Sequence, residues 1–321
     1  MPPESRPCSR LHRSSGPGPR IPQPASLHRA VLPPRPAAAP ATTAWTLPER
    51  LLAAAVLLLV AAAALLPAWQ PPGALLAPYA DARTLVGLPH AMDVLTNLPF
   101  ALVGLWGLWS LRRGPGGWGV AVPAALARLF FTGLVATAAG SAWYHLQPDA
   151  AGLLWDRAGM ALAFAGLLGL AAAHRVSARS GVALAALTLP AGLLAAWLDA
   201  AAGNVLPWAL LQFGGLALLL GLALRPARAG LPALSLAAVI ACYAVAKLLE
   251  MADHAVFEAT GQWVSGHSLK HAVAALAAVP VCVAGATRRH GAATAGVDNG
   301  AHRPTRPWAE KRAPLRRTAP L

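Results

Sequence analysis

Charged residues are scarce in this chain. Asp, Glu, Lys and Arg together make up 12% of its 321 residues, whereas a water-soluble domain carries about 25%. Apolar residues reach 56% and are concentrated in long runs that hold few charges. Such runs predict membrane helices, each of which needs about 20 residues to cross the hydrocarbon core. The composition excludes a water-soluble fold and predicts an all-α, polytopic transmembrane helix bundle.

Cysteine is also rare. Cys8, Cys242 and Cys282 lie far apart, and the last two fall inside apolar runs. This spacing excludes a disulfide framework and fits neither a zinc-binding nor a redox pair of cysteines. The N-terminus lacks the short apolar core and small-residue cleavage site of a secretory signal.

Acidic residues are fewer than basic ones, 12 against 26, and the basic excess is local. Arginines crowd the N-terminal region, the short loops on one side and the C-terminal tail. Basic patches also occur in nucleic-acid-binding proteins. Here they flank apolar runs, which favours a role in fixing membrane topology. We therefore predict no nucleic-acid partner.

The order of segments predicts three regions. Residues 1–48 are rich in Pro, Arg, Ser and Ala without an apolar period, which is typical of a disordered tail. Residues 49–287 form the predicted transmembrane domain, and residues 288–321 a disordered basic tail. Within the domain we expect eight spans, at 51–69, 93–111, 123–146, 153–173, 181–199, 205–224, 231–250 and 265–287.

The arginines predict the orientation. With eight spans, one side of the membrane receives Arg50, Arg112, Arg113, Arg175, Arg179, Arg225, Arg228, Arg288 and Arg289. The other side receives Asp81, Asp149, Asp199, Asp253 and Glu258. Because basic loops stay in the cytoplasm, both termini are expected there. The bias towards Ala, Arg and Pro suggests a high-GC bacterium, and hence its inner membrane.

Polar residues gather where three spans meet the predicted outer face. The stretch GSAWYHLQPDAAGLLWDRAGM at 140–160 holds Ser141, His145 and Asp156, and the stretch SGHSLKHAVAALAAV near the C-terminus holds His267 and His271. A lone histidine at a helix end is more often an interfacial residue. Polar and ionisable groups are expensive inside a membrane and usually mark function, and five of them on one face favour a site.

Spacing suggests the chemistry of that site. His267 and His271 are four residues apart and so share a helix face, as do Ser141 and His145. Two such imidazoles and a third from another helix can hold Zn²⁺ with a position open for water, the pattern of a catalytic zinc. Asp156 would then accept a proton from the water or orient it. Ser141 would hydrogen-bond the water or the developing oxyanion. Hydrolysis of a lipid amide or ester fits this set.

The full pattern resembles a known family. Ser141, His145 and Asp156 at these intervals, followed by the distant pair His267 and His271, are similar to the alkaline ceramidase family of the CREST superfamily of membrane hydrolases. Helix 93–111 contains TNLPFALVGLWG, with Asn97 placed as in the first core helix of that family. The stretch before the histidine pair, AKLLEMADHAVFEATGQWVSGHSLKH, most resembles bacterial ceramidase-domain membrane proteins.

The resemblance implies a function. His145, His267 and His271 would be the zinc ligands, and Ser141 and Asp156 would assist catalysis. The enzyme would be a hydrolase of linear amide carbon–nitrogen bonds that takes ceramide or a related N-acyl lipid from the bilayer. Seven core helices are expected, so the run at 51–69 is an extra N-terminal helix. The acidic cluster that binds calcium in eukaryotic ceramidases is reduced here to Asp81 and Asp93, and no calcium is predicted.

Two other functions remain open at this point. A receptor-like or regulatory member of the superfamily would keep zinc without turnover. A haem-binding bundle would use facing histidines but has no need of Ser141 or Asp156. Nearby, we expect Lys247 and Glu250 to form a pair within their helix or Glu250 to orient a histidine. Lys270 is expected to extend to the outer interface.

Overall fold

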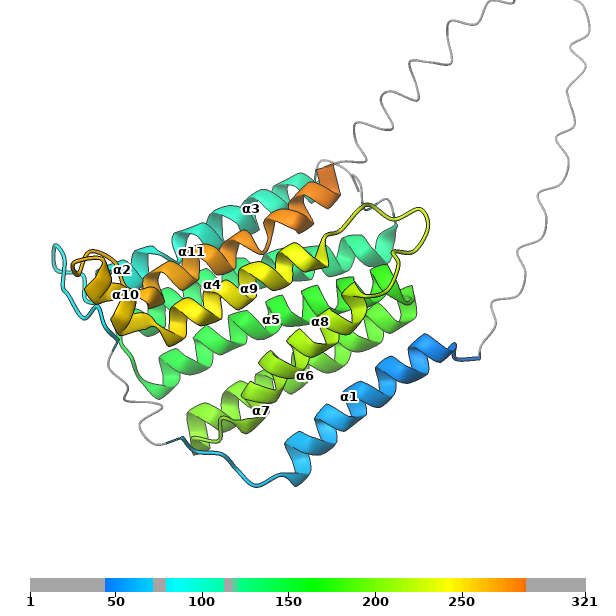
Figure 1. The fold of residues 1–321 in the computed structure, drawn as a ribbon, viewed down its shortest axis with the longest axis horizontal. Helices are drawn as coiled ribbons and strands as arrows, with labels where there is room; N and C mark the ends of the chain where they lie inside the picture. Colours follow the sequence, from blue (N-terminus) through cyan, green and yellow to red (C-terminus); the bar gives the residue numbers. More distant parts are fainter. Residues whose placement is uncertain (1–43, 72–78, 113–117, 119, 287–321) are drawn as a thin grey trace, which may run out of the picture. The chain divides into compact units, whose positions relative to one another are not determined.

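The structure is a computed structural model, and it describes residues 44–71, 79–112, 118 and 120–286. The predicted C-terminal tail lies outside these ranges, as does the predicted N-terminal tail up to residue 43. The helices are α1 (Leu47–Leu65), α2 (Ala91–Leu95), α3 (Leu98–Arg112), α4 (Ala121–Leu146), α5 (Ala150–Arg175), α6 (Ala178–Ala202), α7 (Leu206–Ala209), α8 (Gly215–Ala223), α9 (Leu236–Met251), α10 (Asp253–Ala259) and α11 (Gly266–Leu276). A π-helical turn, η2 (Leu210–Gly214), joins α7 to α8 (Figure 1).

The described part of the chain is all-helical, as predicted. Seven of its helical segments are long and apolar enough to cross a membrane: Leu47–Leu65, Ala91–Arg112, Ala121–Leu146, Ala150–Arg175, Ala178–Ala202, Leu206–Ala223 and Gly266–Ala286. The seventh predicted span, 231–250, is shorter than expected, because α9 begins only at Leu236 and has 16 residues. It still packs in the bundle against α11 and α8. The core therefore consists of seven helical units, with α1 as the extra N-terminal helix.

The first predicted core helix is broken at Thr96 and Asn97. The Thr96 hydroxyl donates to the Met92 carbonyl at 2.7 Å and the Asn97 amide donates to the Asp93 carbonyl at 2.8 Å. Side chains that bond backbone carbonyls in this way compete with the helical ladder. Pro99 has no N–H to continue it. The break divides the span into α2 and α3.

Small residues set the spacing of α4 and α5, which form the most extensive helix pair of the bundle. Gly133 and Gly140 on α4, and Gly159 and Gly166 on α5, recur at seven-residue intervals. A Cβ at Gly140 would lie 2.3 Å from the Trp155 carbonyl oxygen, and one at Gly166 would lie 2.2 Å from the Phe130 nitrogen. Such close backbone approach is how membrane helices pack without a hydrophobic driving force.

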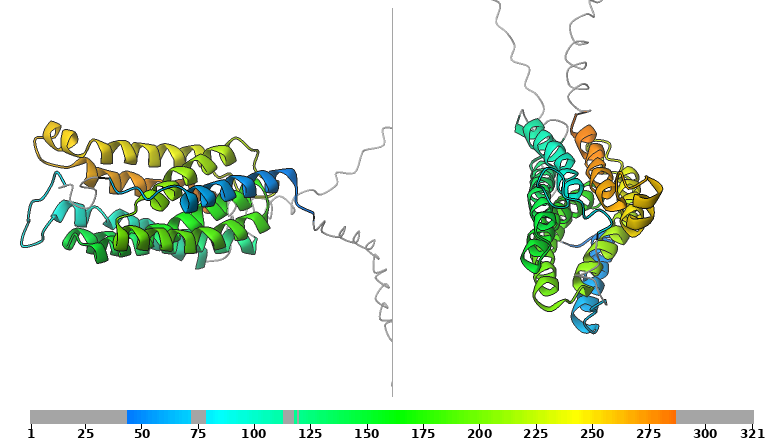
Figure 2. Two further views of the ribbon diagram at one scale, coloured as in Figure 1. Left: turned by 90° about the horizontal axis from the view of Figure 1, so that it is seen from below. Right: turned by 90° about the vertical axis from the view of Figure 1, so that its left-hand side faces the viewer.

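Helix α1 lies at the edge of the bundle, on the side of α6 and α8 and away from α3 and α11 (Figures 1 and 2). The buried Glu49 anchors it, because its carboxylate accepts hydrogen bonds from Arg179 Nε at 2.6 Å and from the Ser177 hydroxyl at 2.6 Å. The segment after α1 is fixed at the other end, where Asn204 accepts from the Trp69 N–H at 3.1 Å. The helix thus closes one flank of the core.

Candidate metal centre

Three buried histidines meet at one end of the bundle. His145 comes from the last turn of α4, and His267 and His271 from the first two turns of α11. The exposed fractions of the three residues are 1%, 6% and 5%. His145 Nε2 and His267 Nε2 are 3.2 Å apart, and one ligand nitrogen from each ring lies within 4.8 Å of the others. The structure therefore brings the three predicted ligands together.

This arrangement fits a metal ion. Zinc–nitrogen bonds of 2.0–2.1 Å in a tetrahedral site imply ligand nitrogens ~3.3 Å apart, close to the separation of His145 and His267. The ligand nitrogen of His271 lies within 4.8 Å of the other two. The neutral imidazole is the form that binds a metal. The donor set suits zinc among several transition metals.

Thr96 determines which nitrogen of His271 faces the cluster. Its hydroxyl oxygen lies 3.1 Å from His271 Nδ1, while its hydrogen is donated to the Met92 carbonyl at 2.7 Å. Thr96 must therefore accept a hydrogen bond from Nδ1–H, which leaves His271 Nε2 unprotonated and available as a ligand. Metal-binding histidines are usually fixed in this way. By contrast, His145 Nδ1 has no hydrogen-bond partner in the described part of the chain.

Asp253 positions the start of α11. Its Oδ1 accepts the backbone N–H of His267 at 2.7 Å, and its Oδ2 accepts the N–H of Ala80 at 2.9 Å. Gly266 permits this contact, since a Cβ there would lie 2.2 Å from the Leu249 carbonyl oxygen. One carboxylate at the start of α10 thus joins the ligand-bearing helix to the segment 79–90 that precedes α2.

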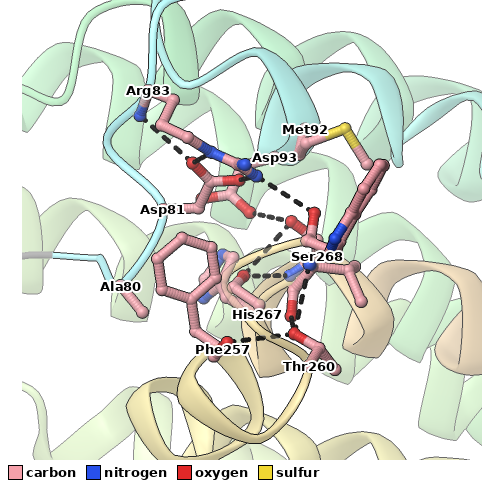
Figure 3. A network of polar contacts seen from close by, with 12 residues as sticks. Ala80, Asp81, Arg83, Met92, Asp93, Phe257, Thr260, His267 and Ser268 are labelled. Atoms are coloured by element: carbon pink, nitrogen blue, oxygen red, sulfur yellow. Dashed lines mark hydrogen bonds and ion pairs between the residues drawn. The ribbon is translucent and has the colours of Figure 1, made fainter.

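The segment 79–90 lies beside the start of α11, with Ala80, Asp81 and Arg83 near His267 and Ser268 (Figure 3). The ring of Tyr79 lies 4.4 Å from the His267 ring and 5.0 Å from the His145 ring, measured between centroids. Burial raises the pKa of Tyr79, so its hydroxyl stays protonated. Arg83 fixes the segment by donating to Asp81 Oδ1 at 2.7 Å and to the Trp263 carbonyl at 3.0 Å.

A buried carboxylate links α2 to α11 beside the cluster. Asp93 is fully buried, and its Oδ1 accepts a hydrogen bond of 2.6 Å from the Ser268 hydroxyl (Figure 3). Its other oxygen, Oδ2, has no partner among the residues that the structure describes. Because Ser268 follows His267 in α11, this bond holds the two helices in register beside the histidine cluster.

Ser141 and Asp156 lie on the wall of the same cavity as the histidines. Ser141 is one turn before His145 on α4 and is buried, while Asp156 sits in the second turn of α5 and is half-buried. The Gly140 crossing brings the two helices together here, and the Ser141 hydroxyl lies within hydrogen-bonding reach of the Asp156 carboxylate. All five predicted site residues therefore surround one space.

The cavity has a volume of about 1100 Å³. Its walls are mostly apolar and aromatic, with Phe130, Leu134, Phe164 and Trp208 among the lining residues. The polar groups are at the histidine end and along α5 and α9, where Arg157 pairs with the buried Asp199 and lies over the Trp208 ring. A pocket with apolar walls and a few convergent polar groups is the usual form of a small-molecule site.

The position of Lys270 differs from what the sequence predicts. Lys270 does not extend to the interface but turns inward, where its Nζ lies 2.6 Å from Glu250 Oε1. Glu250 also pairs with Lys247, as predicted for these two residues of α9. The carboxylate therefore faces two ammonium groups, which are better partners for it than a neutral imidazole. Thr96 takes the role of orienting a histidine instead.

Sequence reasoning did not single out Tyr79, Thr96 or Asp253 as parts of the site. For Thr96 a signal was present, because Pro99 predicts a break in the helix before it. Tyr79 lies in a loop with no periodicity to place it. Asp253 precedes His267 by fourteen residues, and only the fold shows that it caps α11.

No family model, no curated protein and no solved structure matches this chain. The function must therefore be inferred from the residues of the chain and the geometry of the site. That geometry provides a buried group of three histidines able to hold a metal ion, at the wall of a cavity inside a helical membrane protein.

Proposed function

We propose that the protein is a zinc-dependent membrane hydrolase that cleaves the amide bond of ceramide or a related N-acyl lipid. One observation supports this most: His145, His267 and His271 offer ligand nitrogens within 4.8 Å of one another beside a cavity that also contains Ser141 and Asp156. A structural site would have no need of such a cavity. A catalytic site needs one, with room for substrate and water next to the ligands.

Each polar group would have a defined task. Bound zinc would supply Lewis-acid polarisation of the amide carbonyl and would acidify water. Asp156 would accept a proton from the attacking water and return it to the leaving nitrogen as the carbon–nitrogen bond breaks, giving a fatty acid and an amine. Ser141, which has one hydrogen to donate, would hydrogen-bond the developing oxyanion.

The environment suits a lipid substrate. The aromatic and aliphatic walls of the cavity would take the acyl chain. The segment 79–90 lies over the histidines, with Tyr79 packed on two of the rings, so entry from the bilayer side is favoured over entry past this segment. The arginine distribution supports a cytoplasmic location of both termini and a site near the outer face of a bacterial inner membrane.

Replacing Asp156 tests the hydrolase against the regulatory alternative. In detergent-purified Asp156→Ala with zinc added, we expect zinc content equal to that of the wild type and a loss of ceramide hydrolysis of about 100-fold or more, measured as fatty acid released by mass spectrometry. If zinc-loaded wild type releases no fatty acid from ceramide or other N-acyl lipids, the hydrolase proposal is wrong. Undiminished turnover in the variant would remove Asp156 from the mechanism.

The haem alternative has little support from the geometry. Two axial imidazoles must leave room for a porphyrin plane between them, with iron–nitrogen bonds of ~2 Å on each side. His145 Nε2 and His267 Nε2 are 3.2 Å apart, which is less than this arrangement requires. A Soret band in the purified protein would reverse this conclusion.

A further inference from the structure

One polar side chain in the cavity wall has no task in the mechanism above. Gln212 lines the cavity and is 7% exposed. Its carboxamide makes no hydrogen bond to another residue in the described part of the chain. A carboxamide offers two N–H donors and a carbonyl acceptor, and burying it without partners costs free energy. Its presence in an apolar wall therefore needs a reason other than packing.

The backbone around Gln212 is also unusual. The residue lies in the middle of the π-helical turn η2, and turns of this kind occur mostly at functional sites. Two residues later, a Cβ at Gly214 would lie 2.6 Å from Leu59 Cδ2 of α1. The turn therefore packs against α1 on one side and contributes Gln212 to the cavity on the other.

Contacts with α5 show how deep Gln212 lies. The rings of Trp208 and Phe164 have centroids 6.2 Å apart. Further along the same pair of helices, a Cβ at Gly215 would lie 3.5 Å from Leu168 Cδ1. The chain from Trp208 to Gly215 thus follows α5 from the level of Phe164 to that of Leu168, and Gln212 lies between them.

This level is far from the reacting groups. Phe164 follows Asp156 by eight residues on α5, which is about 12 Å along a helix. The partner of Gln212 is therefore not the amide at the histidines but a group well along the acyl chain.

Tyr243 of α9 supplies a second polar group at the same level. It lines the cavity, and its ring centroid lies 6.1 Å from that of Phe164. Its hydroxyl is buried and has no hydrogen-bond partner among the residues that the structure describes. Neither Tyr243 nor Gln212 is charged, so the two side chains suit a neutral group that can both donate and accept hydrogen bonds.

We propose that Gln212 and Tyr243 form a subsite for a hydroxyl group in the middle of the acyl chain of the substrate. This inference rests on the proposed hydrolase function and narrows its substrate class to lipids with a hydroxylated acyl chain. A chain hydroxyl would pair with both side chains, whereas a methylene group would leave both unpaired. Sites that hydrogen-bond a substrate hydroxyl discriminate strongly against the analogue without it for this reason.

Displacement of a bound fatty acid tests the subsite without turnover, because the acid is the product of the proposed reaction and has no amide bond. Full-length protein as purified, in an uncharged detergent, binds tritiated octadecanoic acid. The label is displaced by unlabelled octadecanoic acid, 10-hydroxyoctadecanoic acid or 18-hydroxyoctadecanoic acid. We expect the 10-hydroxy acid to displace it at about tenfold lower concentration than octadecanoic acid. The 18-hydroxy acid should show no such gain, because its hydroxyl is at the chain end.

Variants assign the preference to the two side chains. Gln212→Leu removes the carboxamide with little change in size. It should weaken binding of the 10-hydroxy acid and keep or tighten binding of octadecanoic acid, since no carboxamide is then left unpaired. Tyr243→Phe should lower the preference several-fold. Gln70→Leu is the matched control and should keep the preference, because Gln70 is exposed and donates to the Ala202 carbonyl at 2.7 Å.

Three results would overturn the proposal: no displaceable binding of the label, equal displacement by octadecanoic and 10-hydroxyoctadecanoic acid, or an undiminished preference in Gln212→Leu and Tyr243→Phe. If Gln212→Leu does not fold, Tyr243→Phe alone decides.

The two proposals fail separately. A preference for the 10-hydroxy acid in a protein that releases no fatty acid from any N-acyl lipid would support the subsite and contradict the hydrolase. Hydrolysis of ceramide by a protein that binds the three acids equally would support the hydrolase and contradict the subsite.

Discussion

His145 and His267 point their Nε2 atoms at each other across 3.2 Å, from helices whose contacting residues are 122 positions apart in the sequence. Two imidazoles at this distance either share one hydrogen or share one ion. His271 stands beside both, with ring centroids 5.2 Å from His145 and 4.9 Å from His267. A hydrogen bond joins only two of the three rings, whereas one metal ion can bind all three. The arrangement therefore favours an ion.

The first prediction concerns metal content. Purified wild-type protein should contain about one zinc per chain, and His267→Ala with His271→Ala should contain none, because two of three ligands are lost. Inductively coupled plasma mass spectrometry measures this directly. His174→Gln is the matched control: His174 is equally buried, but at the other end of α5, where its Nε2 contacts the Pro232 carbonyl at 2.6 Å. Zinc retained by the double variant would refute the site.

Thr96→Val tests the orientation of His271. The substitution keeps the shape of the side chain but removes the oxygen that accepts from Nδ1–H. Loss of such a partner should weaken zinc binding about 10- to 100-fold, measured by competition with a chromogenic chelator, while the helical content by circular dichroism stays the same.

Thr137→Val provides the control for this experiment. Thr137 is a buried threonine on α4 that lines the same cavity, but its hydroxyl donates to the Gly133 carbonyl at 2.8 Å and not to a histidine. Its zinc affinity should equal that of the wild type. Equal losses in the two variants would show that any change in this cavity weakens zinc and would exclude a specific role of Thr96.

The helical architecture was predictable because it depends on composition and run length. The seven core helices and the extra N-terminal helix follow from apolar runs that must satisfy their backbone groups internally. The length of α9 was not predictable in the same way. Residues 231–235 belong to an apolar run, but Ser235 caps the helix by accepting from the Ala238 N–H at 3.3 Å. This N-terminal cap within the apolar run makes the helix begin at Leu236, five residues later than predicted.

The histidine cluster was predictable because His267 and His271 are four residues apart on α11 and histidine is rare in membrane helices. The contacts that fix them were not, since they join segments far apart in sequence. Asp253 reaches His267 and Ala80, and Tyr79 packs on His145, only after α4, α10 and α11 have assembled. The ion pair of Lys270 with Glu250 was not predictable for the same reason, because it forms only when α9 packs against α11.

Gly140→Ala tests whether the α4–α5 crossing places Asp156. A methyl group at this position would lie 2.3 Å from the Trp155 carbonyl oxygen, so the helices must separate. Overpacking of this kind costs about 1–3 kcal/mol and should lower the midpoint of thermal unfolding in detergent. It should also reduce hydrolysis more than zinc content, because Asp156 moves with α5 while the histidines lie on α4 and α11. Gly221→Ala is the control, since nothing lies within 4 Å of its added Cβ, and it should be neutral or stabilising.

The last prediction concerns acid and the segment over the site. Burial raises the pKa of Asp81, but the hydrogen bonds from Arg83 outweigh it, and the pKa of this carboxyl lies below its ordinary value of 3.8. A carboxylate whose pKa is lower in the folded state contributes stability above the unfolded pKa and loses that contribution as the pH falls through the folded one. Asp81→Asn should therefore destabilise the protein by a constant amount at neutral pH, and the difference should shrink below about pH 4.

Thermal unfolding of the wild type and Asp81→Asn over a pH series measures this difference. Arg83 is 41% exposed, so the ion pair is screened by solvent and the effect at neutral pH should be about 1 kcal/mol or less. The same variant should loosen segment 79–90 and so expose Tyr79 to collisional quenchers at neutral pH, where the carboxylate would normally be charged. A difference in stability that grows towards acid would mean that Asp81 is held protonated in the folded protein, and the Arg83 pairing would then not be what fixes the segment over the histidines.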